Sequence, residues 1–282
     1  MTKILITGAT GTNGKALVNK LNQLNANYVI GTRNPDQARE LFQGSEIVTF
    51  DFENPSTYEK SVQGVDKVFL LGPPLTLKVD QLLNPFIDFL NDKGIKRVVY
   101  FSALASDKMG SELDFHIKIE DKLKNDGFDY TILRPSFFAQ NFKNYDLENI
   151  TERNSIFSVA GTGKVAFVDV HDIANVAATV LLNSGHSKKT YELTGPETVS
   201  FYDVAIELSA ILGTNIIYPN PSAKQFKEVL TNAGAPEFIA DYLISVYSII
   251  AKNHVNIVTD DIEKITGKKP TSLKAVLQRD FK

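Results

Sequence analysis

Lys3 to Leu21 reads KILITGATGTNGKALVNKL, and this stretch decides the fold. An apolar run leads into Gly8, Gly11 and Gly14, and apolar residues then recur at helical spacing, which predicts a buried strand, a tight loop and a helix. Gly8 allows the sharp turn, Gly11 lets the backbone approach a ligand, and Gly14 lets the helix pack on the strand. Free N–H groups at the helix start would seat a pyrophosphate. The stretch therefore favours a dinucleotide site over a purely structural glycine turn, although its spacing is G-x-x-G-x-x-G.

Composition narrows the class of protein. The 282 residues are 43% hydrophobic and 22% charged, which is typical of a globular protein. A net charge of -3 argues against nucleic acid or an anionic membrane as a partner. The chain has no cysteine and four scattered histidines, so we expect no disulfide, no thiolate chemistry and no metal site. We recognise no signal peptide and no membrane-spanning run, and therefore expect a cytoplasmic protein.

Strands and helices alternate through the first half of the chain. After the opening strand, apolar runs predict strands near residues 28–31, 46–50, 67–71, 97–101 and 128–133, with helices at 79–93 and 113–124. This alternation predicts an α/β fold with a doubly wound, mostly parallel sheet. We expect residues 1–150 to form this dinucleotide-binding domain.

Residues 151–282 are expected to form a smaller, mainly helical region on the substrate side. Strands at 165–168 and 190–193 would add to the first domain, so we expect one compact body. The predicted helices cover 169–182, 200–212, 223–232, 236–252 and a last stretch from about Thr259 to the end.

The end of the second strand indicates the cofactor. A site that prefers NAD places an acid there, about 20 residues past the glycines, to bind the ribose 2′-hydroxyl. This chain has Gly31-Thr32-Arg33-Asn34, with no acid at the strand end. A guanidinium at Arg33 would pair with a 2′-phosphate, which favours NADP(H) over NAD(H). The alternative is that Arg33 is a solvated surface residue.

Other candidate residues stand where predicted strands end. Asp51 and Phe52 would bracket an adenine, or else serve as a loop cap and a core residue. The segment from Leu71 to Pro74 should line the cofactor, because ligands gather at the carboxyl ends of parallel strands. Ser102 ends the fifth strand.

Several stretches together resemble one family. These are residues 7–14 (TGATGTNG), 32–35 (TRNP), 131–135 (TILRP) with Asn141, 168–174 (VDVHDIA) and 193–197 (LTGPE). Through them the chain resembles, over nearly its whole length, the NmrA-like branch of the atypical short-chain dehydrogenases/reductases. That resemblance implies an NAD(P)-binding Rossmann fold that takes NADP(H), with a small C-terminal region shaping a substrate cleft.

The resemblance also implies which residues contact the cofactor. The pyrophosphate would lie on Gly8, Thr10, Gly11, Thr12, Asn13 and Gly14. Arg33 would take the 2′-phosphate, Asp51 and Phe52 would meet the adenine, and Leu71, Gly72 and Pro73 would follow the ribose. The nicotinamide end would be approached by Ser136, Phe137, Phe138 and Asn141.

The chain departs from ordinary short-chain dehydrogenases on one helix. On the helix where they carry a Tyr-x-x-x-Lys pair for proton transfer, this sequence has His116 and Glu120, four residues apart. If these two occupy the places of the pair, the acid–base groups for alcohol–ketone chemistry are absent or altered. Some similar proteins reduce quinones, azo dyes or triphenylmethane dyes, which accept a hydride directly; others are NADP-binding redox sensors. We therefore expect an NADPH-dependent reductase of a small conjugated acceptor, as monomer or homodimer. A non-catalytic regulator is the alternative, and a nucleotide-sugar epimerase ranks last because it needs the missing tyrosine.

Two residues are candidate catalytic groups for such a reductase. His116 would donate a proton, because an imidazole titrates near neutrality, or else it is a helix-surface histidine paired with Glu120. Ser102 would hydrogen-bond a substrate oxygen, or else cap its strand. The aromatic residues Phe137, Phe138, Tyr145 and those of 238–247 would stack on a flat acceptor or belong to the core.

Overall fold

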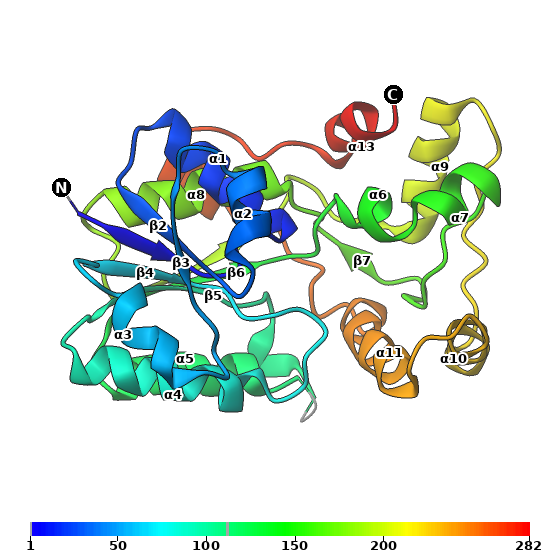
Figure 1. Ribbon diagram of the computed structural model, residues 1–282. Helices are drawn as coiled ribbons and strands as arrows, with labels where there is room; N and C mark the ends of the chain where they lie inside the picture. The colour runs from blue at the N-terminus through cyan, green and yellow to red at the C-terminus, as the bar shows by residue number, and fades with distance from the viewer. Residues whose placement is uncertain (1, 111–112) are drawn as a thin grey trace.

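A parallel sheet forms the centre of the protein. The computed structural model describes residues 2–110 and 113–282. Within them the sheet has seven strands in the order β3-β2-β1-β4-β5-β6-β8 (Figure 1). The strands are β1 (Ile4–Ile6), β2 (Tyr28–Thr32), β3 (Glu46–Thr49), β4 (Lys67–Leu70), β5 (Arg97–Phe101), β6 (Asp129–Pro135) and β8 (Lys189–Leu193).

Helices cover both faces of this sheet. One face is packed by α1 (Thr12–Gln23), α2 (Pro35–Leu41), α8 (Val170–Leu182) and α12 (Asp261–Thr266). The other face is packed by α3 (Tyr58–Ser61), α4 (Val79–Asp92) and α5 (Phe115–Asn125). Because both faces are covered, the central strands are continuous apolar runs, and every residue of β1 is buried. The predicted doubly wound fold is confirmed.

The chain reverses its winding direction at β1. Strand β1 pairs on one side with β2 and on the other with β4, so the chain first builds outward to β3 and then returns. In open parallel sheets, ligands bind in the crevice at the carboxyl ends of the strands at such a reversal. The glycine loop after β1 lies at that point.

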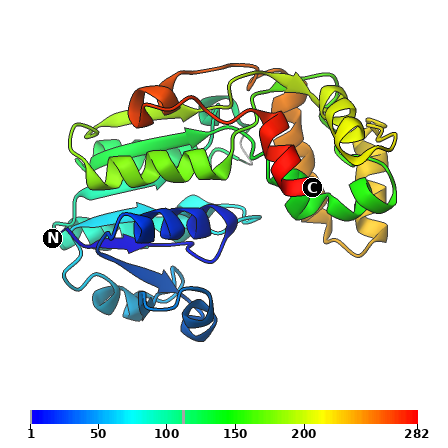
Figure 2. The same cartoon turned by 90° about the horizontal axis from the view of Figure 1, so that it is seen from above.

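A second group of elements lies beyond the carboxyl ends of the strands (Figures 1 and 2). It comprises α6 (Asn141–Tyr145), α7 (Leu147–Glu152), β7 (Lys164–Val165), β9 (Val199–Ser200), α9 (Phe201–Leu212), α10 (Ala223–Asn232), α11 (Glu237–Ala251) and α13 (Leu273–Phe281). An aromatic cluster holds it together, with Phe201 contacting Phe142, Phe167 and Tyr247. This cluster joins the core under α4 and α5, so the chain has one continuous body.

Two predictions about the later chain were wrong in detail. The last stretch is not one helix, because Gly267 ends α12 in the left-handed conformation (φ +69°) and Pro270 follows before α13 begins. The predicted strand at 165–168 is only β7, which pairs antiparallel with β9, while Val168 forms an isolated bridge with Phe138. Neither α6 nor α7 was predicted, because both are short. Among the described residues, no helix is long and apolar enough to span a membrane.

Candidate functional site

The glycine loop is fixed by contacts with the neighbouring loop. Gly8 adopts a left-handed conformation (φ +68°), which a residue with a side chain rarely takes up. Leu71 N donates to Thr7 Oγ1 at 2.8 Å, and an added Cβ on Gly8 would lie 2.9 Å from the Leu71 side chain. The loops that follow β1 and β4 are therefore adjacent, as the predicted cofactor contacts at Leu71, Gly72 and Pro73 require.

The other two glycines serve different purposes. A Cβ on Gly14 would lie 2.2 Å from the Gly8 carbonyl oxygen, so this glycine lets the helix approach the loop itself rather than the strand. A Cβ on Gly11 would meet only that same oxygen, at 3.5 Å. Gly11 is the N-cap of α1 and has no side chain to cap the first backbone N–H groups of the helix. The helix start thus keeps donors available for an anion.

Arg33 lies at the end of β2 with its guanidinium unengaged. The side chain is exposed, and no hydrogen bond or ion pair joins it to the described residues. The next residue, Asn34, caps α2 by accepting from Gln37 N at 3.2 Å. Asp36 pairs with Arg39, so the nearest acid does not neutralise Arg33. This arrangement is compatible with either expectation for Arg33, and the 2′-phosphate role stays a prediction.

The residues expected at the adenine have partners of their own. Asp51 Oδ1 accepts from Glu53 N at 3.1 Å and closes a turn. Phe52 is partly buried and contacts Phe50 edge-on, with 4.8 Å between ring centroids. Cap and core roles are therefore present, and contact with an adenine stays a prediction.

The segment after β6 is anchored through a buried carboxylate. Asp169, at the start of α8, accepts from Gln140 Nε2 at 2.9 Å and from an Arg279 nitrogen at 2.8 Å. Gln140 Oε1 in turn accepts from Val170 N at 3.0 Å. The C-terminal helix α13 therefore helps to hold the loop of Ser136, Phe137, Phe138 and Asn141, the residues expected near the nicotinamide. Arg279 and Gln140 were not predicted, because 110 and 29 residues separate them from Asp169.

The aromatic residues expected to stack on an acceptor are divided. Phe138 packs against Phe101, and Tyr247 packs against Phe201 and Phe226, so these partly buried rings lie against the core, and stacking on an acceptor stays a prediction. Tyr145 and the first aromatic residue of α11, Phe238, are exposed.

Helix α6 lies against the glycine loop, because Asn144 Nδ2 donates to Thr12 Oγ1 at 3.2 Å. No local pattern in the sequence predicts this contact.

Glu120 is the centre of a buried polar cluster. Its carboxylate is fully buried and accepts from two Arg134 nitrogens at 2.9 and 2.6 Å. Ser102 Oγ donates to it at 2.7 Å and Ser106 Oγ at 3.2 Å. Ser102 is only 2% exposed, so its hydroxyl is already committed to Glu120. Its predicted contact with a substrate oxygen stays untested, and the geometry favours a positioning role.

His116 has a different partner from the one expected. Its Nδ1 lies 2.8 Å from the hydroxyl of the buried Tyr100 on β5, and Glu120 makes no hydrogen bond to it. Burial lowers the pKa of His116 to about 4. The negative charge of Glu120 partly opposes this shift, and the positive charge of Arg134 adds to it. Burial therefore opposes the charged imidazole that the expected proton donation requires, and that donation stays a prediction.

Comparison with known proteins matches this geometry to a family. A model described as NAD(P)H-binding matches residues 8–184, from the glycine loop to the end of α8. The chain belongs to the NAD(P)H-binding family. Two curated relatives are a prestalk A differentiation protein of Dictyostelium discoideum (29% identical, covering 99% of this chain and 92% of that one) and an NAD(P)H azoreductase of Xenophilus azovorans (31% identical, covering 94% and 93%).

Two solved structures resemble this NAD(P)H-binding protein over their whole length. One is an NADPH-dependent quinone oxidoreductase of Escherichia coli in complex with NADPH, 28% identical, with a TM-score of 0.89 and coverage of 99% and 100%. The other is the Citrobacter sp. triphenylmethane reductase with NADP(H), 28% identical, with a TM-score of 0.87 and coverage of 99% of both chains. The resemblance to a quinone and dye reductase family is confirmed.

The family assignment makes Gly11 a direct test of the cofactor cradle. Replacing Gly11 with alanine is expected to weaken NADPH binding by roughly tenfold or more, because its Cβ projects where the pyrophosphate approaches the backbone. Thermal unfolding should stay unchanged. Gly110→Ala is the matched control, since its Cβ meets nothing within 4 Å in the part of the chain that the structure describes. Equal affinity of the two variants for NADPH, by titration, would contradict the placement.

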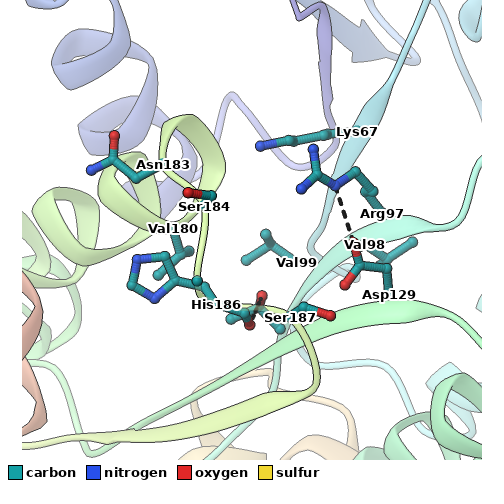
Figure 3. A pocket seen from close by; sticks show the side chains of 12 residues that line it. Lys67, Arg97, Val98, Val99, Asp129, Val180, Asn183, Ser184, His186 and Ser187 are labelled. Atoms are coloured by element: carbon teal, nitrogen blue, oxygen red, sulfur yellow. Dashed lines mark hydrogen bonds and ion pairs between the residues drawn. The ribbon is translucent and has the colours of Figure 1, made fainter.

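A small cavity at the opposite edge of the sheet does not belong to this site. It has a volume of about 40 Å³ and lies where β4, β5 and β6 begin. Figure 3 shows the Arg97–Asp129 pair on one side of it and His186 with Ser184 on the other. Lys67 is buried there, and its ammonium group donates to the Leu181 carbonyl at the end of α8. We assign this lysine to capping the helix.

Proposed function

We propose that this protein is an NADPH-dependent oxidoreductase that transfers a hydride to a quinone-like or extended conjugated small-molecule acceptor. The observation that carries the proposal is the Glu120 cluster. The helix expected to carry the Tyr-x-x-x-Lys pair has instead His116, whose pKa burial lowers, and a carboxylate held by Arg134 and Ser102. Such a helix lacks the pair that alcohol–ketone chemistry uses, whereas quinones and cationic dyes accept a hydride without it.

The chain's own residues would bind and orient the reactants. The start of α1 and Gly11 would hold the pyrophosphate, and Arg33 would take the 2′-phosphate. The loop after β6, anchored by Gln140 and Asp169, would position the nicotinamide end. The bound cofactor supplies the hydride, and holding an acceptor at contact distance is a large part of the rate acceleration. The names of the azoreductase, quinone oxidoreductase and triphenylmethane reductase relatives support this acceptor class.

The test is acceptor-dependent loss of the reduced nicotinamide absorbance. Purified protein would be mixed with NADPH and, separately, with a quinone, an azo dye and a cationic triphenylmethane dye, with NADH run in parallel. We expect turnover of at least one acceptor class with NADPH preferred. Absence of turnover with every acceptor, while NADPH binding remains measurable by titration, would reject the enzyme.

That negative outcome would favour a second candidate, a non-catalytic NADP(H)-binding regulator. The observation in its favour is the same replacement of the proton-transfer pair. A regulator should bind NADP⁺ and NADPH with different affinity and change its association with a partner protein accordingly. An enzyme does not require such a change.

A further inference from the structure

We propose that His116 is a neutral hydrogen-bond donor to the carbonyl oxygen of a quinone-type acceptor, and that Tyr100 fixes the tautomer that makes it one. The inference rests on the proposed reductase function and assigns a role within it. It replaces the expected proton transfer from a charged imidazole with stabilisation by an uncharged N–H group.

Hydrogen-bond accounting assigns the proton on the ring. Tyr100 is 1% exposed, and among residues 2–110 and 113–282 the partner of its hydroxyl is His116 Nδ1, at 2.8 Å. A buried hydroxyl that donated to nothing would forgo its hydrogen bond at a cost of about 1–3 kcal/mol. Tyr100 therefore donates, Nδ1 accepts, and the hydrogen of the neutral ring is on Nε2.

Nε2 of His116 has no hydrogen-bond partner among the residues that the structure describes, and it is not among their buried polar atoms without a partner. The side chain as a whole is half-buried. His116 is in the first turn of α5, the helix that follows β5, so it lies at the carboxyl edge of the sheet, where the ligand crevice is expected.

The surroundings keep this donor uncharged through the neutral range. Burial and the positive charge of Arg134 oppose protonation of the ring, and Glu120, which favours it, is already bonded to Arg134. Tyr100 stays protonated, because its burial and the negative charges of Glu120 and of Asp80 on α4 all raise its pKa. These surroundings favour the neutral ring, with its hydrogen on Nε2, at neutral pH.

The charge that develops during hydride transfer predicts which acceptors need the His116 Nε2–H donor. Hydride transfer to a quinone places negative charge on a carbonyl oxygen, and a preorganised N–H group lowers the energy of that charge. His116 keeps its proton, and the proton that completes the hydroquinone comes from solvent. A cationic triphenylmethane dye accepts the hydride at its central carbon and becomes neutral, so no oxyanion develops and the donor gains nothing.

The experiment compares the two acceptor classes in three variants. His116→Phe should lower kcat/KM for the quinone by roughly 100-fold and leave dye reduction within roughly threefold. His116→Gln, which keeps an N–H near the Nε2 position, should recover most of the quinone activity. His186→Phe is the matched control, because His186 makes the same 2.8 Å contact with a tyrosine, Tyr191, at the opposite edge of the sheet. It should change neither reaction.

Three outcomes would overturn the assignment. An equal decrease of kcat/KM for the quinone and the dye in His116→Phe would show a general effect on the site. No decrease for either acceptor would show that His116 has no role. The third is spectroscopic and needs no turnover. Nitrogen-15 shifts of His116 at neutral pH should show hydrogen on Nε2 and none on Nδ1, and any other pattern would refute the proposal. If the wild-type protein reduced neither of these acceptors nor the azo dye, the proposed function itself would fail.

Discussion

Replacing Glu120 with alanine is expected to lower the free energy of unfolding by about 3 kcal/mol or more, because it leaves the Arg134 guanidinium without the carboxylate that now accepts two of its hydrogen bonds. Urea unfolding would measure the change. Asp121→Ala removes an exposed acid from the same helix and should cost less than about 1 kcal/mol. Adding Arg134→Met to Glu120→Met should recover stability relative to the single change, because the unpaired charge is then gone. Further loss in the double variant would contradict this account.

The dependence of stability on pH should also reveal the pairing of Glu120 with Arg134. Burial by itself raises the pKa of Glu120, but the hydrogen bonds from Arg134 and Ser102, with the Arg134 and Lys124 charges, leave the pKa below its ordinary value. A carboxyl group with a depressed folded-state pKa contributes stability above its unfolded-state pKa, and this is lost as the pH falls through the folded-state pKa. Wild-type stability should therefore fall more steeply than that of Glu120→Ala below about pH 4.3. Parallel curves would refute the pairing.

Reversing the charge of Arg33 should have the largest effect on cofactor choice. Arg33→Glu is expected to weaken NADPH binding by roughly 100-fold, since an unengaged guanidinium is replaced by an acid that repels the 2′-phosphate. NADH lacks that phosphate, so its affinity should change little. Arg39→Glu alters the charge by the same amount on the neighbouring helix, where the native arginine pairs with Asp36. If both variants lowered the NADPH affinity equally, the cause would be the overall charge of the surface instead of a contact between Arg33 and the 2′-phosphate.

The features that could be predicted depend on local rules. A left-handed turn at Gly8 and the close approach at Gly14 are backbone requirements that only glycine meets, so the loop could be recognised from its letters. The break between α12 and α13 also has a local signal, because Gly267 ends α12 and Pro270 follows it. The partner of His116 is not predictable from the sequence, since Tyr100 comes from another element and the local i, i+4 rule points to Glu120.

Long-range partners set the limit for the rest of the site. Glu120 and Arg134 come from a helix and the following strand, and their pairing depends on how α5 packs against β6. Asn144 and Thr12 meet only because α6 folds back over the glycine loop. Contacts of this kind follow from the assembled fold, and no periodicity in the sequence reports them.

The late arrival of the last sheet elements has a consequence for synthesis. Strand β8, which completes the sheet beside β6, begins at Lys189, and α12 adds Ile262 to the core on the α1 and α8 face. The ion pair between Asp169, at the start of α8, and Arg279 can form only after Arg279 has been synthesised. The nucleotide-binding half therefore reaches its final form only after residues up to Arg279 have been synthesised, and a nascent chain that still lacks β8 leaves the edge of β6 unpaired.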